Sequence, residues 1–93
     1  MLVIIKSAPD TPEGRRALKL ASEMPADVAL LQNAVYFLQT GGLEGFKNRI
    51  FVLDDDKKLR GLTDNSEGKN ISDINYEGLI DLMAESDKVV GML

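Results

Sequence analysis

Three consecutive aspartates, Asp54, Asp55 and Asp56, follow a run of four apolar residues and are the side chains of this sequence best suited to chemistry. Carboxylates are ligands that Mg²⁺ favours, and Asp54 at a strand end is also a candidate phosphoacceptor. A phosphoacceptor site of the receiver type needs an acidic pair after the first strand, where this sequence has Lys6 and Ser7. The acids also fit a helix start, with Asp54 as the cap and the other two at the positive end. We favour the helix start over a metal or phosphoacceptor site.

Ser7 is a candidate nucleophile, but the sequence has no residue of the type that usually activates a serine. The 93 residues include no histidine to serve as a general base, and the adjacent Lys6 would point to the opposite face of a strand. The sequence also has no cysteine, which excludes disulfides, thiolate ligands and thiol nucleophiles. Gly41 and Gly42 are not followed by Gly-Lys-Ser/Thr, so they do not form a phosphate loop. We therefore predict no catalytic, cofactor or metal residues.

The overall composition indicates one ordinary globular domain. A chain of 93 residues corresponds to a single domain, 1–93, and one of this size buries about 60% of its unfolded surface. The net charge of −4 argues against direct nucleic-acid binding. Only five apolar residues precede Lys6, and no segment approaches the roughly 20 apolar residues of a membrane helix. We expect a cytoplasmic protein with no membrane contact.

The elements that must position these residues alternate between strands and helices. Strands are predicted at 2–5, 27–31, 50–53, 71–74 and 88–93. Helices are predicted at 12–24, 34–39, 54–60 and 76–86, with Thr11, Asn33, Asp54 and Asn75 as caps, and with Pro25, Gly41-Gly42 and Gly61 as stops. The polar stretch 63–70 is the predicted mobile loop. Alternation with short connections predicts an α/β fold with a parallel sheet and helices on both faces.

The first and last predicted helices both carry an apolar stripe at helical spacing. In the first helix the stripe consists of Ala17, Leu18, Ala21 and Met24, and in the last helix of Tyr76, Leu79, Ile80 and Met83. The solvent-facing sides are assigned to Arg15, Arg16, Lys19 and Glu23 in the first helix and to Glu77, Asp81 and Glu85 in the last. The periodicity thus predicts two helices of the same design.

Two surfaces are candidates for contact with a partner. Val35, Tyr36 and Phe37 make the segment 34–39 apolar nearly all the way round, which suits a helix with the core on one side and a partner on the other. Arg15 and Arg16 form a basic patch with Lys19, and Lys57, Lys58 and Arg60 are possible neighbours of that patch. The basic patch suits an acidic partner or an RNA backbone, but in a chain of net charge −4 we favour an ordinary solvated face.

Several segments, in order along the chain, resemble the DsrH/TusB family. They are Lys6-Ser7 with 17–21 (ALKLA) and 30–35 (LLQNAV), then 51–62 (FVLDDDKKLRGL), and finally 76–82 (YEGLIDL) with 87–90 (DKVV). The segment 51–62 is similar to a YVL-x-x-D-x-x-x-RG signature of the family. The resemblance implies a DsrE-like, three-layer α/β/α fold, flavodoxin-like in appearance, around a mainly parallel five-stranded sheet.

The resemblance also implies a role in sulfur transfer. Related subunits form TusBCD-type relays, which pass persulfide sulfur toward 2-thiolation of the tRNA wobble uridine, or DsrEFH-type complexes of sulfur oxidation. The position that matches the family's cysteine is Ala17, so this chain resembles the cysteine-free TusB side of the family. The implied role is a non-catalytic structural subunit with TusC/TusD-like (DsrE/DsrF-like) partners.

An alternative is a self-associating protein of the same fold, a homo-oligomer outside a relay and without enzymatic activity of its own. Under both readings the predicted partner contacts are the same set: Val35, Tyr36, Phe37, Arg15, Arg16, Asp54 and Asp55. No cofactor is expected under either reading.

Overall fold

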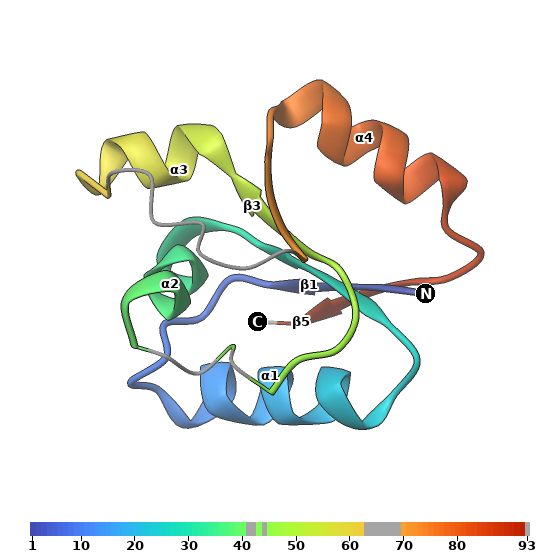
Figure 1. Cartoon of the computed structure of the whole chain (residues 1–93), viewed down its shortest axis with the longest axis horizontal. Helices are drawn as coiled ribbons and strands as arrows, with labels where there is room; N and C mark the ends of the chain where they lie inside the picture. The colour runs from blue at the N-terminus through green and yellow to red at the C-terminus, as the bar shows by residue number, and fades with distance from the viewer. Residues whose placement is uncertain (41–42, 44, 63–69, 93) are drawn as a thin grey trace.

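The computed structural model describes residues 1–40, 43, 45–62 and 70–92, which form an α/β fold around one parallel sheet (Figure 1). The strands are β1 (Leu2–Ile5), β2 (Asp27–Leu30), β3 (Ile50–Leu53), β4 (Ile71–Ile74) and β5 (Val89–Met92), in the order β4-β3-β2-β1-β5. The helices are α1 (Pro12–Glu23), the 3₁₀ helix η1 (Gln32–Tyr36), α2 (Phe37–Thr40), α3 (Asp54–Leu59) and α4 (Tyr76–Glu85). The predicted fold class is confirmed, and every strand pairing is parallel.

The apolar runs of β1 and β3 are explained by their place inside the sheet. Every residue of these two strands is buried, because β1 lies between β2 and β5 and β3 lies between β2 and β4. In register, Val3 lies beside Val28, and Val28 beside Ile50. Strands of a parallel sheet covered on both faces are apolar throughout, whereas the edge strand β4 leaves its two middle residues exposed.

The predicted ends of α1, α4 and α3 are confirmed. The Thr11 hydroxyl accepts a hydrogen bond from the Gly14 amide at 3.0 Å and caps α1. The Asn75 side chain accepts one from the Gly78 amide at 2.8 Å and caps α4. Gly61 follows α3 with a φ of 67°, the left-handed conformation that favours glycine after a helix.

Two predicted caps, Asn33 and Asp54, are wrong. Asn33 lies inside η1, which begins one residue earlier, and its side-chain oxygen accepts a hydrogen bond from Arg60 Nε at 3.1 Å. Asp54 is the first residue of α3 and not the residue before it, and the cap position, Leu53, provides no side-chain hydrogen bond. The two side chains that the local pattern assigns to caps have other partners: Asn33 contacts Arg60, and Asp54 forms an ion pair with Lys58.

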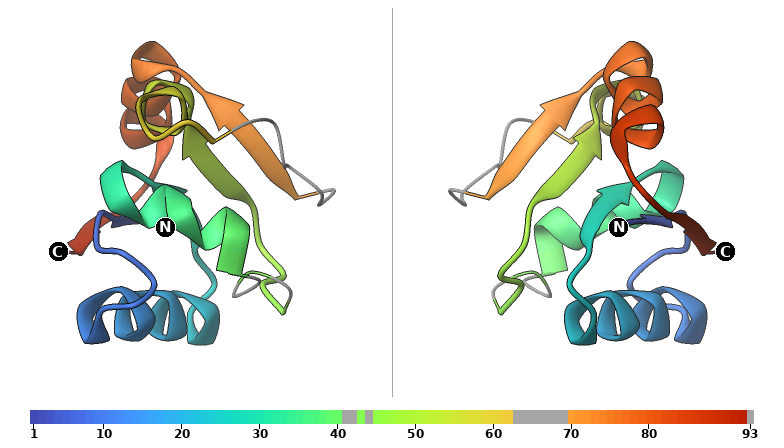
Figure 2. Two further views of the ribbon diagram at one scale, coloured as in Figure 1. Left: turned by 90° about the vertical axis from the view of Figure 1, so that its left-hand side faces the viewer. Right: turned by 90° about the vertical axis from the view of Figure 1, so that its right-hand side faces the viewer.

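Two apolar clusters fill the two faces of the sheet (Figure 2). The larger combines alternate strand residues with Ala17, Leu18 and Ala21 of α1 and with residues of η1 and α2. The smaller combines the other strand residues with Leu79 of α4, and Leu82 packs against it. Helices α1 and α4 therefore lie on opposite faces of the sheet.

Some predicted features lie outside the described residues. They are the Gly41-Gly42 stop, most of the 63–70 loop, and Leu93 at the end of the predicted last strand, which the structure records as Val89–Met92. In the part of the chain that is described, no helix is long and apolar enough to cross a membrane.

Candidate functional site

The three aspartates after β3 lie in three different environments. Asp54 pairs with Lys58 one turn along α3 at 3.1 Å, and this hydrogen bond and charge raise the pKa of Lys58. Asp55 is exposed to solvent. Asp56 is 6% exposed and accepts a hydrogen bond at 2.6 Å from the amide of Gln32. Within the described ranges, no set of three or more acidic side chains is placed to hold a metal ion together.

Asp56 holds together two loops at the carboxyl ends of neighbouring strands. The Gln32 residue that donates to it has a φ of 51°, a left-handed conformation that is uncommon outside glycine. Arg60 Nη1 lies 3.7 Å from the Asp56 carboxylate and also donates to the Asp56 carbonyl at 3.3 Å. The carboxylate thus fixes the turn after β2 against α3, which is a structural task.

Lys57 is a buried cation that the sequence does not predict. Its side chain is 3% exposed, and Nζ donates to both oxygens of Asp73 in β4 at 3.0 and 3.1 Å. The prediction placed Lys57 with Lys58 and Arg60 on a wet basic surface; only Lys58 of the three is exposed. The local sequence of this short polar helix does not indicate that Lys57 is buried. Its burial depends on the position of Asp73 in β4, which is set by the order of the strands.

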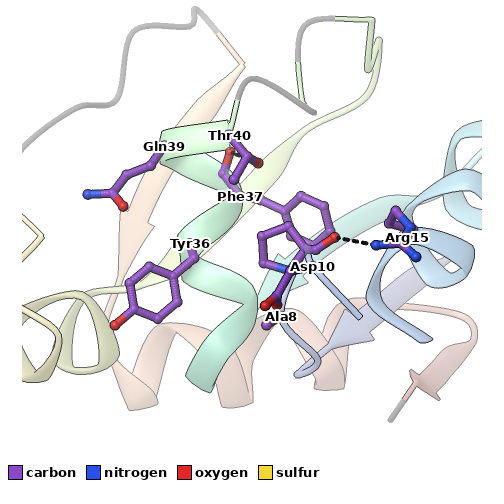
Figure 3. Close-up of a pocket in the computed structure, with 8 residues that line it drawn as sticks. Ala8, Asp10, Arg15, Tyr36, Phe37, Gln39 and Thr40 are labelled. Atoms are coloured by element: carbon purple, nitrogen blue, oxygen red, sulfur yellow. Dashed lines mark hydrogen bonds between the residues drawn. The ribbon is translucent and has the colours of Figure 1, made fainter. Parts of the chain in front are cut away.

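A pocket of about 610 Å³ opens beside the carboxyl ends of β1 and β2 (Figure 3). The loop after β1 forms one wall, α1 contributes Arg15, and η1 and α2 form the opposite wall. Its lining is Ala8, Pro9, Asp10, Arg15, Tyr36, Phe37, Gln39 and Thr40. This is the edge of a parallel sheet where ligand-binding groups usually gather.

Two features of α1 keep the pocket walls in place. Thr11 Oγ1 donates to the Ala8 carbonyl at 2.7 Å while it caps the helix, which fixes the loop against the first turn. Gly14 lies so close to that loop that a Cβ atom there would collide with the Ala8 carbonyl oxygen. Glycine at position 14 therefore permits the close approach of α1 and the β1–α1 loop.

The pocket is largely apolar and has one cation on its wall. Arg15 Nη1 donates to the Pro9 carbonyl at 3.4 Å, a long hydrogen bond, and its guanidinium forms no ion pair with any described residue. Tyr36 is half-buried and lines the pocket from η1, and Asp10 lines it from the loop after β1. This arrangement suits an apolar side chain that has a negatively charged neighbour to meet Arg15.

A second hollow of about 390 Å³ continues from the first along α1. It shares Arg15 and Phe37 with the pocket and adds Leu18, Lys19, Ser22, Gly45 and Phe46. The two hollows together form one groove between α1 and α2, which we call the α1/α2 groove. Its floor is apolar, and Arg15 and Lys19 stand along one side.

The predicted partner contacts fall into three groups. Arg15, Tyr36 and Phe37 meet in the pocket, although Phe37 is almost entirely buried beneath it. Val35 lies in the core with no exposed surface, so its side chain is not available to a partner of the folded chain. Arg16 is exposed on α1 outside the pocket lining, and Asp54 and Asp55 lie at the end of β3, also outside it. The sequence does not predict Gln39 or Thr40 as pocket residues, because the helix they end is too short to show a periodic pattern.

Two residues with proposed chemistry are placed by the structure as well. Ala17, which matches the family's cysteine, is 1% exposed and packs in the core under α1. Ser7 is half-buried and Lys6 is exposed after β1, and no hydrogen bond joins their side chains in the described part of the chain.

The comparisons with known proteins agree with this architecture. A crystal structure, that of the ychN protein from E. coli, superposes with a TM-score of 0.76 at 16% sequence identity and covers 98% of this chain and 97% of its own. This likeness shows the fold. No curated protein matches the sequence. The family model described as DsrH like protein matches residues 6–89, nearly the whole chain. The chain therefore belongs to the DsrH-like family.

Proposed function

We propose that this protein is a non-catalytic structural subunit of a sulfur-relay complex. The observation that carries the proposal is the DsrH-like family match over residues 6–89 in a chain with no cysteine. A persulfide needs a thiol to carry it, so the sulfur must travel on another subunit while this chain supports the assembly.

The proposed partners are TusC/TusD-like (DsrE/DsrF-like) subunits, and the proposed reaction is persulfide transfer toward 2-thiolation of the tRNA wobble uridine. A role in sulfur oxidation is the alternative within the same family. The α1/α2 groove supports partner binding, because it combines an apolar floor with Arg15, which forms no ion pair with any described residue. The net charge of −4 supports contact with protein subunits over direct contact with tRNA. The proposed role in tRNA thiolation supports a cytoplasmic location.

Co-expression with TusC- and TusD-like subunits from the same source tests the proposal. We expect all three chains to copurify and native mass spectrometry to record each in equal number. The TusC–TusD pair without this chain is the control, and a chain carrying Arg15→Glu should copurify less than one carrying Arg16→Glu. If the control pair forms and this chain never joins it, the relay role is wrong.

Self-association is a second candidate role, favoured by the apolar surface that α4 exposes. Tyr76, Ile80 and Met83 are all more than two-fifths exposed. Light scattering at tens of micromolar (about the Kd range of ordinary weak interfaces) tests it on the isolated chain, and a strict monomer would exclude it.

A further inference from the structure

Helix α4 presents an apolar stripe that nothing in the described chain covers. Tyr76 is 53% exposed, Ile80 63% and Met83 41%, and their spacing of four and three residues puts them on one line along the helix. The sequence predicts this stripe together with Leu79, but only Leu79 faces the sheet, at 7% exposed. Three large apolar side chains on one short helix make a surface suited to contact with protein.

An acidic ridge runs beside the α4 stripe. Glu77, Asp81 and Glu85 repeat at four-residue spacing, so their carboxylates line the next face of the helix. All three are exposed, and none forms an ion pair within the described residues. A surface that covers the stripe must therefore accommodate three negative charges along one side.

The α1/α2 groove has the opposite character. Its floor of Leu18, Phe37 and Phe46 is apolar, and Arg15 and Lys19 stand beside it four residues apart on α1. Neither cation forms an ion pair within the described residues. Four residues of helix rise about 6 Å, so the cations are spaced as two successive acids of the ridge are. Asp10, at the far end of the pocket, is the one acidic side chain of the lining.

We propose that the α1/α2 groove of one copy of this chain binds helix α4 of a second copy. The stripe supplies the apolar side chains for the floor, and the acidic ridge supplies partners for Arg15 and Lys19. A symmetrical contact of α4 with α4 is disfavoured, because it would bring two acidic ridges together. Charge complementarity therefore selects the contact between unlike surfaces.

The two surfaces lie on opposite faces of the sheet, so the contact is head-to-tail (Figure 2). Each copy then offers one α4 and one groove, and the assembly grows until it closes into a ring or continues as a chain. This inference goes beyond the proposed relay role and does not depend on it. The relay partners are also proposed to bind the α1/α2 groove, so a second copy and a relay partner would compete for it. Copurification with relay partners and self-association are separate measurements, so the two proposals can fail separately.

Mixing two complementary variants tests the contact. Ile80→Lys alters the stripe and leaves the groove intact, whereas Arg15→Glu combined with Lys19→Glu alters the groove and leaves the stripe intact. We expect the wild type to self-associate in analytical ultracentrifugation, each variant alone to be at least about tenfold weaker, and an equimolar mixture to form a one-to-one dimer and nothing larger. Arg16→Glu, outside the groove, is the matched control and should assemble as the wild type does.

A charge swap supplies the second, independent measurement. A chain with Glu77→Lys, Asp81→Lys, Arg15→Glu and Lys19→Glu exchanges the charges of both surfaces and should regain self-association that each half-swap loses. Circular dichroism and urea unfolding of every variant separate loss of contact from loss of fold; if Ile80→Lys unfolds, Ile80→Ser takes its place.

Three results would overturn the inference. The first is a wild type that stays monomeric at about 100 μM, well above the Kd of ordinary weak interfaces. The second is a pair of complementary, folded variants that do not form a dimer when they are mixed. The third is a charge-swapped chain that stays monomeric. A wild type that stays monomeric but binds relay partners through Arg15 and Lys19 would assign the groove to those partners instead.

Discussion

Helices α1 and α4 begin with the same device and carry similar apolar stripes, but only one of the stripes is buried. Thr11 and Asn75 cap them in the same way, each accepting a hydrogen bond from an amide three residues on. The stripe of α1 is enclosed because η1 and α2 lie beside it on the same face of the sheet. On the opposite face, the smaller cluster draws on no other described helix than α4, so no second described helix helps to bury the flank of α4 in that cluster.

Periodicity therefore predicts an amphipathic helix, but it does not predict how many neighbouring helices cover its apolar face. One neighbouring helix is enough to bury a line of side chains, and its absence leaves the line exposed. The exposed stripe of α4 is therefore a property of the layer in which the helix lies. A subunit that assembles with others would retain such a surface, because association covers it.

We expect the greatest loss of folding free energy when a core residue on the α1 face of the sheet is replaced, and a much smaller loss for an exposed residue of α4. Val35→Asp puts a carboxylate where the side chain has no exposed surface, and we expect a loss of more than about 4 kcal/mol, enough to unfold the chain. Ile80→Asp, at a largely exposed position, should cost less than about 1 kcal/mol. Urea unfolding followed by circular dichroism measures both. Equal losses would show that the two positions do not differ as the structure has them.

This pair also shows what the sequence could and could not predict. The apolar run Val35-Tyr36-Phe37 predicts a helix with a core side and a partner side, and it does not distinguish them. The structure assigns both Val35, in η1, and Phe37, in α2, to the core. By contrast, the strands and the caps at Thr11 and Asn75 are local features, and the sequence predicted them correctly.

The next effect separates two adjacent residues of α4. Leu79→Ala removes a buried side chain from the smaller cluster and should cost about 2–3 kcal/mol of folding free energy. Ile80→Ala should cost less than about 1 kcal/mol but should weaken self-association. Urea midpoints and sedimentation of both variants provide the comparison. A stability loss for Ile80→Ala as large as that for Leu79→Ala would mean that the stripe is covered within the chain.

A smaller effect is expected within the aspartate triplet. The sequence assigns all three residues to the start of a helix, whereas the structure buries Asp56 and exposes Asp55. Asp56→Ala leaves the Gln32 amide and Arg60 without their carboxylate and should cost about 1–3 kcal/mol. Asp55→Ala changes an exposed residue and should cost less than about 1 kcal/mol, mostly through the helix dipole. Thermal unfolding of the two variants side by side is the measurement, and a more damaging Asp55→Ala would contradict the assigned contacts.

The aspartates also show why the site was less predictable than the fold. Asp54 pairs with Lys58 in its own helix, Asp55 is exposed, and Asp56 meets a residue from another part of the chain, a contact that depends on sheet order. Asp56 reaches Gln32 because β2 and β3 are neighbours, and Lys57 reaches Asp73 because β4 follows β3 at the edge. The spacing of residues along the chain does not reveal which strands are neighbours, whereas it does reveal the periodicity of each strand and helix.

The smallest expected effect distinguishes two adjacent arginines of α1 that the sequence assigns to one patch. Arg16→Glu should change the free energy of unfolding by less than about 0.5 kcal/mol and leave assembly unchanged, because Arg16 is exposed and does not line the groove. Arg15→Glu should be equally mild for folding, since its one hydrogen bond is long, but should weaken assembly by placing an acid opposite the acidic ridge of α4. Urea unfolding and sedimentation at low salt measure the two quantities separately, and salt should reduce the difference in assembly between the variants. If both reversals weaken assembly equally, the basic face of α1 acts as a diffuse charge and the groove has no special part in it.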